Sequence, residues 1–272
     1  MLNLFRTEWL KIKNYPGFWW IMVITVLSYP GINGMFYFIY KENTANSKSA
    51  AQMLKMLLGN PFEFPEVFRT TAFASSLFVL IPAILVIMLI TNEYTYKTNR
   101  QNVIDGWSRN EFLIAKFLNV VIISLIVIAL YIIVTLSIGF STTGADVKDK
   151  FQLAHYTALF SLQVFAQLSF AFLLGLVIKR AFIALGVFIF YKIILENIAA
   201  ELLNKNVHAD TGRFLPTESS DLLTPVPAFL GRLDPKVYDH ALSLIKQQVF
   251  ITIAYVFIFW GLVFWIYKKR DL

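Results

Sequence analysis

Long apolar segments alternate with shorter polar segments along this chain. Six segments are long and apolar enough to cross a bilayer, whose core needs about 20 mostly apolar residues per helix. None has the strict alternation of a membrane β-barrel strand. The pattern predicts an all-α, polytopic membrane protein that forms one domain, 1–272. The six predicted spans are 18–40, 67–91, 112–139, 153–178, 181–202 and 247–267.

The residues before the first span have the pattern of an amphipathic helix. Such a helix suits the membrane interface, although a solvated basic segment that only directs topology would also fit. Its apolar positions are Leu2, Phe5, Trp9 and Ile12, and its opposite face carries Asn3, Thr7 and Lys11.

Proline, aspartate and charged residues mark several expected breaks and helix ends. Pro30 and Pro82 should kink the first and second spans, because proline removes a backbone hydrogen bond. Lys179 and Arg180 indicate a tight turn between the fourth and fifth spans. Asp234 before Pro235 is a good helix start. The last helix should therefore begin before the bilayer, after an outer segment that is partly helical.

The composition and the charge distribution support a membrane protein with both termini in the cytoplasm. The chain is 57% hydrophobic and 15% charged, with a net charge of +7 and a mean hydropathy of +0.62. With the N-terminus inside, the inner segments carry twelve basic and five acidic residues, and the outer segments carry eleven of each. The positive-inside rule therefore predicts cytoplasmic termini in the inner (cytoplasmic) membrane. The basic excess then reflects topology and predicts no nucleic-acid binding.

Motifs for enzyme chemistry are missing from the sequence. There are no cysteines, and the histidines at 155, 208 and 240 lack the spacing of a zinc site. The stretch "GFSTTG" from Gly139 to Gly144 lacks the lysine of a phosphate-binding loop. We therefore expect no catalytic residue, no metal and no cofactor in this chain.

A dense polar insert, "TNEYTYKTNRQNVIDGWSRNEFLIAK", separates the second and third spans from Thr91 to Lys116. Ser108 with Glu111 forms a capping-box pattern just before the apolar run. A floppy loop would not need this signal, and a minimal connector would be shorter. The insert is therefore predicted to be a structured cytoplasmic protrusion that includes a short helix.

The insert resembles the permease subunits of type-2 ABC exporters, the ABC-2 family. Such subunits often carry a glutamate after the second span, then a threonine and a basic residue, then a Ser-Arg pair and a lysine in the next helix. This chain departs from that pattern with Lys97 where glycine is usual and Gly106 where proline is usual. The matching residues are Glu93, Thr98, Arg100, Ser108, Arg109, Phe112 and Lys116.

The resemblance implies that the insert, about 92–111, is a coupling helix that docks into a separate ABC ATPase subunit, which binds ATP and Mg²⁺. It also implies a second permease chain, expected as a homodimer, with the substrate pathway between the copies. Glu93 and Arg109 would hold the insert or contact the ATPase, unless they form a salt bridge within the loop. The rival interpretation is a carrier, channel or structural membrane protein that works without ATP.

Two charged residues lie inside the fifth predicted span. Lys192 and Glu196 are four residues apart and should share one helix face. Unpaired charges at that depth cost about 2.5–3.5 kcal/mol each, so they should pair or face a wet cavity. They would line the substrate path or a subunit interface, or they would simply neutralise each other.

Overall fold

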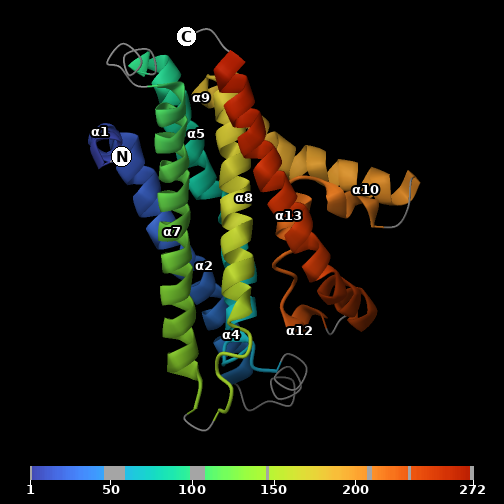
Figure 1. Cartoon of the computed structure of the whole chain (residues 1–272). Coiled ribbons are helices and arrows are strands. Elements are labelled where there is room, and N and C mark those ends of the chain that lie inside the picture. The colour runs from blue at the N-terminus through green and yellow to red at the C-terminus, as the bar shows by residue number, and fades with distance from the viewer. Residues whose placement is uncertain are drawn as a thin grey trace.

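A computed structural model describes residues 2–45, 59–98, 108–144, 147–206, 210–231 and 234–269. Most of these residues are helical and none is in a strand, which confirms the predicted all-α class. The helices that correspond to the expected spans run mostly side by side in one bundle (Figure 1). They are α2 (Pro16–Ala45), α4 (Val67–Ser76) with α5 (Leu80–Thr95), α7 (Arg109–Thr142), α8 (His155–Ile178), α9 (Ala181–Phe190) with η1 (Tyr191–Leu195) and α10 (Glu196–Asn206), and α13 (Pro235–Lys269).

The second span is broken into two helices. The axes of α4 and α5 differ by 46°, and three residues, 77–79, separate them. Pro82 lies in the first turn of α5, where it has no N–H to donate to the carbonyl of Phe78. The backbone just before it makes tighter bonds, from Phe78 to Ser75 and from Ile81 to Phe78. The predicted kink is confirmed, and counting this bent pair as one span gives six.

Helix α8 is the centre of the bundle. It packs against α5, α7 and α13, while α2 packs against the outer side of α5 and α7 (Figure 1). In the most apolar stretch of α8, 67% of the residues are buried, against 17% in α2. A helix that is apolar all round and also buried belongs to the core of a membrane bundle.

Local sequence signals fix several helix ends as expected. The capping box at the start of α7 is complete: the Ser108 hydroxyl accepts from the Glu111 N–H, and the Glu111 carboxylate accepts from the Ser108 N–H. The Val237 N–H donates to the Asp234 carboxylate at 3.2 Å, so α13 begins at Pro235. Between α8 and α9 the chain turns at Lys179, whose φ of 61° is left-handed.

The segment between α10 and α13 is built from short helices. They are η2 (Thr211–Phe214), α11 (Glu218–Asp221) and α12 (Ala228–Gly231). In Figure 1, α10 projects away from the bundle. Helix α11 contacts both α10 and α13, and α12 contacts α13. The expected helical segment between the fifth and sixth spans is therefore present.

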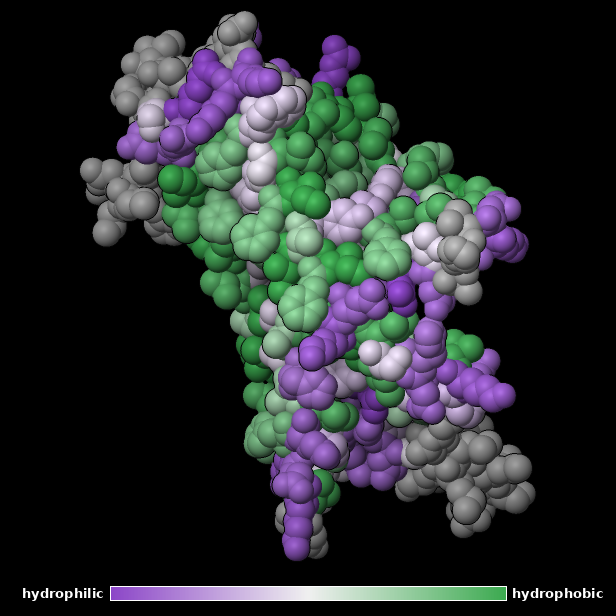
Figure 2. Space-filling model, turned by 45° about the vertical axis from the view of Figure 1, so that its right-hand side comes forward, coloured by the Kyte–Doolittle hydropathy of each residue, from purple (hydrophilic) through white to green (hydrophobic). Residues whose placement is uncertain are grey.

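The surface has the hydropathy of a membrane protein. Figure 2 shows a broad apolar band with hydrophilic side chains above and below it. Large apolar side chains are exposed on α2, α9 and α13, for example Trp20 at 72%, Phe182 at 90% and Phe257 at 74%. Together with the long apolar helices, this surface identifies a multi-pass membrane protein.

Candidate functional site

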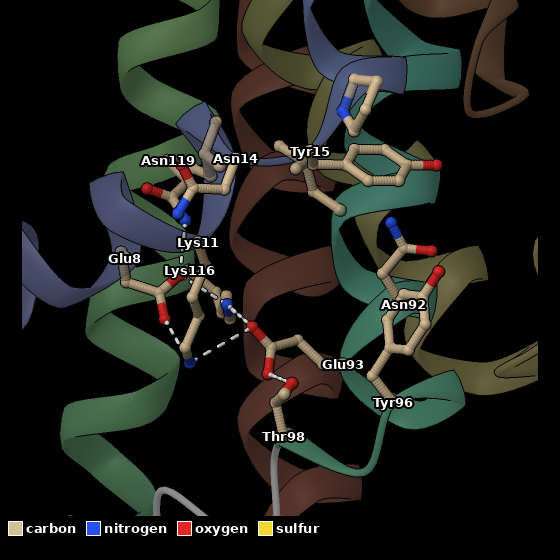
Figure 3. Close-up of a pocket in the computed structure, with 13 residues that line it drawn as sticks. Glu8, Lys11, Asn14, Tyr15, Asn92, Glu93, Tyr96, Thr98, Lys116 and Asn119 are labelled. Carbon is tan, nitrogen blue, oxygen red and sulfur yellow. Dashed lines mark hydrogen bonds and ion pairs between the residues drawn. The ribbon is translucent and has the colours of Figure 1, made fainter.

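Four charged side chains meet between α1 (Leu2–Lys13), α5 and α7. Figure 3 shows Glu8 and Lys11 of α1, Glu93 of α5 and Lys116 of α7 pointing toward one another. We call this group the charge cluster. The charge cluster joins helices that are far apart in sequence: Glu8 of α1 and Lys116 of α7 are separated by 108 residues.

Lys116 is the shared cation of the charge cluster. Its Nζ donates to Glu8 Oε2 at 2.5 Å and also donates to Glu93 Oε1. Lys11 Nζ lies 3.3 Å from Glu8 Oε1 and 3.7 Å from Glu93 Oε1. Asn119, one turn along α7, donates to Glu8 Oε2 at 2.9 Å. The two carboxylates and two ammonium groups of the charge cluster therefore balance.

Three of the four side chains of the charge cluster are buried. The side chains of Glu8, Glu93 and Lys116 are only 1%, 6% and 4% exposed, whereas Lys11 is 29% exposed. Burial alone would raise the pKa of Glu8, but the ammonium groups of Lys116 and Lys11 and the hydrogen bonds from Lys116 and Asn119 hold it below its ordinary value of 4.5. Glu8 is therefore ionised, and it ties α1 to α7 electrostatically.

The charge cluster also fixes the start of the polar insert. Glu93 lies in the last turn of α5, and the Thr98 hydroxyl reaches back to donate to Glu93 Oε2. Between them, Lys97 adopts a left-handed φ of 55°. The glycine usual at this position in the ABC-2 pattern would favour the same conformation. The residues at the start of the insert therefore turn back onto the cluster.

A cavity of about 390 Å³ opens beside the charge cluster. Amides and phenols line it together with the charged groups, notably Asn14, Tyr15, Asn92 and Tyr96 (Figure 3). In the described part of the chain, no group of three or more histidine or acidic side chains is placed to hold a metal ion. The contacts of the charge cluster anchor α1 to both α5 and α7.

The remaining residues of the insert motif lie around its far end. Ser108 caps α7, and Arg109 Nη1 donates to the backbone carbonyl of Lys268 near the end of α13, at 2.7 Å. Glu93 and Arg109 do not form a salt bridge with each other, because Glu93 contacts α1 and α7 and Arg109 contacts the end of α13. Arg100 and the expected coupling helix itself fall within 99–107, outside the described residues.

Lys192 and Glu196 do not pair with each other, so the expectation of mutual neutralisation is wrong. Lys192 Nζ donates to Gln167 Oε1 at 2.5 Å and lies 3.5 Å from Asp221 Oδ1. Gln163 and Gln167 donate to the same Asp221 oxygen at 2.8 and 2.6 Å. We call Lys192, Asp221 and these two glutamines the amide cluster.

Glu196 has a different role from Lys192. Its Oε1 accepts from the backbone N–H groups of Thr217 and Glu218 at 2.7 and 3.1 Å, which caps the start of α11. The intervening residues form a π-helix, in which the Glu196 N–H bonds to the Tyr191 carbonyl five residues back. Residues four apart therefore no longer lie on one face.

The sequence did not identify three members of the candidate site. Lys11 was placed only on the polar face of the predicted interfacial helix, and the sequence pattern did not single out Glu8 or Asn119. One signal was available: Lys116 and Asn119 are three residues apart on α7, so they share a face. A lysine and an asparagine on one face of an apolar helix require a polar partner.

A comparison with protein-family models finds one matching family. The family model described as "ABC-2 family transporter protein" matches residues 4–195. The matched range contains the whole charge cluster and every helix from α2 to α9. No curated protein matches the chain.

Proposed function

Because this chain belongs to the ABC-2 family of transporter proteins, we propose that it is the membrane-spanning permease subunit of an ATP-driven exporter. In this proposal two copies, as a homodimer, enclose the substrate pathway, and separate ATPase subunits bind ATP and Mg²⁺. Both termini and the polar insert face the cytoplasm, in the cytoplasmic membrane. The chain itself supplies transport helices and no catalytic group.

The observation that carries the proposal is the anchoring of the insert by the charge cluster. A docking element transmits force only if it cannot move independently of the spans. At the start of the insert, Glu93 is bound by Lys116 of α7 and Lys11 of α1. A displacement of the insert would therefore reach α1, α5 and α7 together.

The far end of the insert is anchored as well. Ser108 and Glu111 fix the first turn of α7, and Arg109 contacts the end of α13. Glu93 is only 5% exposed, which favours a role in holding the insert over direct contact with an ATPase. Exposed residues near it, such as Tyr96 at 67%, are better placed for that contact.

The test is affinity purification from the native membrane in a mild detergent, followed by mass spectrometry and an ATPase assay. We expect a near-stoichiometric subunit with nucleotide-binding motifs and ATP hydrolysis in the purified complex. In the double variant Glu93→Gln with Arg109→Ala, we expect the ATPase subunit to be lost or its hydrolysis to be uncoupled from transport.

The matched control is Glu201→Gln with Lys205→Ala. This change also removes one acid and one base, but from a pair on α10 that is 66% and 68% exposed. It should leave the complex intact. If no ATPase accompanies the unmodified chain under conditions that preserve other ABC complexes, the proposal is wrong and the ATP-independent carrier replaces it.

A further inference from the structure

An apolar chamber lies at the end of the bundle far from the charge cluster. It has a volume of about 280 Å³ and is bounded by α2, the residues before α4, α4 itself and α12. Aromatic and aliphatic side chains form its walls, chiefly Phe36, Phe73, Phe229 and Leu230. A cavity of this size with such walls suits a hydrocarbon chain better than water.

One polar atom in the apolar chamber has no partner. Thr70 lines the chamber and is only 4% exposed, and its hydroxyl makes no hydrogen bond within the described residues. Most buried polar groups in proteins are hydrogen-bonded. An occupant with an ester or amide oxygen near its chain would satisfy this hydroxyl.

A second chamber, polar and about 260 Å³ in volume, lies beside the first. The two share Tyr40 and Phe62, whose rings pack at 5.6 Å. The Tyr40 hydroxyl donates to the Gly59 carbonyl at 2.7 Å. This hydrogen bond holds the Tyr40 ring in place between the two chambers. Lys41 and Glu63 bring opposite charges to the polar chamber, and no ion pair joins Lys41 to any described residue.

The two chambers and the charge cluster lie toward opposite ends of α7. Ser141 of α7 lines the polar chamber, 25 residues beyond Lys116 of the charge cluster. At helical rise this separation is about 37 Å, slightly more than the roughly 30 Å hydrocarbon core of a bilayer. A polar chamber at this level would meet lipid head groups.

We propose that the paired chambers bind one zwitterionic membrane phospholipid of the phosphatidylethanolamine type. One acyl chain occupies the apolar chamber, with an ester oxygen near Thr70. The phosphate faces Lys41, and the head-group ammonium faces Glu63. Ile39 lines the apolar chamber and is also 49% exposed on α2, so a lipid can enter sideways from the bilayer. Lipid tails are already in an apolar environment, so selectivity comes from the head group.

This site does not depend on the proposed ATPase partner. Binding is a property of the chain in a bilayer, and it can be measured without nucleotide. A failure of the exporter proposal would leave the lipid site standing, and the reverse is also true.

The experiment uses the full-length protein in nanodiscs of phosphatidylglycerol with a trace of photoreactive lipid. The probe is phosphatidylethanolamine with a diazirine in one acyl chain, compared with the same chain on phosphatidylglycerol. Mass spectrometry maps the crosslinks. We expect labelling of Phe36 and Phe73, with the ethanolamine probe preferred about fivefold, or about 1 kcal/mol, because only its head group carries an ammonium that faces Glu63.

Two sets of variants separate the chain contact from the head contact. Leu230→Trp should fill the apolar chamber and reduce its labelling to the background of bulk lipid. Leu262→Trp is the control, because these leucines are similarly exposed, at 38% and 40%. Lys41→Gln with Glu63→Gln should abolish the head-group preference and keep the chain labelling, while Lys236→Gln should change neither.

Three results would overturn the proposal. The first is equal labelling by the two head groups in the unmodified protein. The second is labelling that falls equally in the two tryptophan variants. The third is chamber labelling no higher than that of lipid-facing residues such as Phe257.

Discussion

The charge cluster and the amide cluster each hold a lysine by polar contacts, but the partners of the two lysines differ. Lys116 is held by two carboxylates from two other helices, each no more than 6% exposed. Lys192 is held by a neutral amide and by Asp221, whose side chain is 39% exposed and lies on a four-residue helix. The first lysine is enclosed by long helices, and the second lies at the edge of the bundle.

We therefore expect the contacts of the charge cluster to be harder to break than those of the amide cluster. Breaking the charge cluster would leave buried charged groups without partners, which costs free energy. Helices α1, α5 and α7 should therefore move as a unit. Breaking the amide cluster leaves Asp221 partly hydrated and still bonded to Gln163. The segment that contains α11 can therefore separate from α8 at lower cost. The predictions below test this contrast.

The largest effect is expected from Lys116→Met. The change leaves Glu8 and Glu93 buried with only the partly exposed Lys11, and losing one partner of a buried pair costs about 3–5 kcal/mol. Denaturant unfolding in detergent measures the loss. Adding Glu8→Gln and Glu93→Gln should restore most of the stability. If the triple variant is no more stable than the single one, the unpaired carboxylates do not cause the loss.

The equivalent change in the amide cluster, Lys192→Met, should cost less, about 1–3 kcal/mol. Its effect should be local, with faster hydrogen exchange in α11 and little change in α1. Lys205→Met, on the exposed side of α10, should stay within about 0.5 kcal/mol. A loss as large as that of Lys116→Met would contradict the distinction between the two clusters.

Acid should affect the two regions in opposite directions. The pKa of Glu8 is lowered, so its contribution to stability is complete above 4.5 and is lost as the pH falls through the lower folded pKa. The pKa of Glu218 is raised, first by burial and then by Asp221, against the opposing effect of Lys192. The region around α11 should therefore become more stable as the pH falls from neutral toward 4.5.

Hydrogen exchange, corrected for intrinsic rates, measures both pH responses in one sample. Protection of α1 should fall below pH 4.5, and protection of α11 should rise before that point. Glu8→Gln should abolish the first change, and Glu218→Gln the second. Parallel loss of protection in both helices would mean that global unfolding, not these carboxyls, sets the response.

The smallest expected effect is that of Ser108→Ala. It removes the side-chain half of the capping box and should cost about 1 kcal/mol, seen as faster exchange in the first turn of α7. Ser141→Ala, at the other end of α7, is the control. A change in ATPase coupling without faster exchange would show that Ser108 contacts the partner directly.

The spans and their ends were predictable because their signals are local. Apolar length, the Ser108–Glu111 box and the Asp234–Pro235 start each act within a few residues. The partners of Lys116 and Lys192 were not predictable in this way. Glu8 is 108 residues from Lys116, and Asp221 lies in a segment with no helical periodicity. The prediction that Lys192 and Glu196 share one helix face was wrong, because the π-helix changes the number of residues per turn.

Lys116 and Lys192 also differ in the order in which the ribosome makes their partners. Synthesis proceeds from the N-terminus, so Glu8 and Glu93 both exist before Lys116 emerges. The third span can thus enter the bilayer when both carboxylate partners of Lys116 have already been synthesised. Lys192 emerges 29 residues before Asp221, with only Gln167 available to receive it. The fifth span therefore passes through a stage in which its lysine lacks a counter-ion, and membrane insertion of the chain should be slowest there.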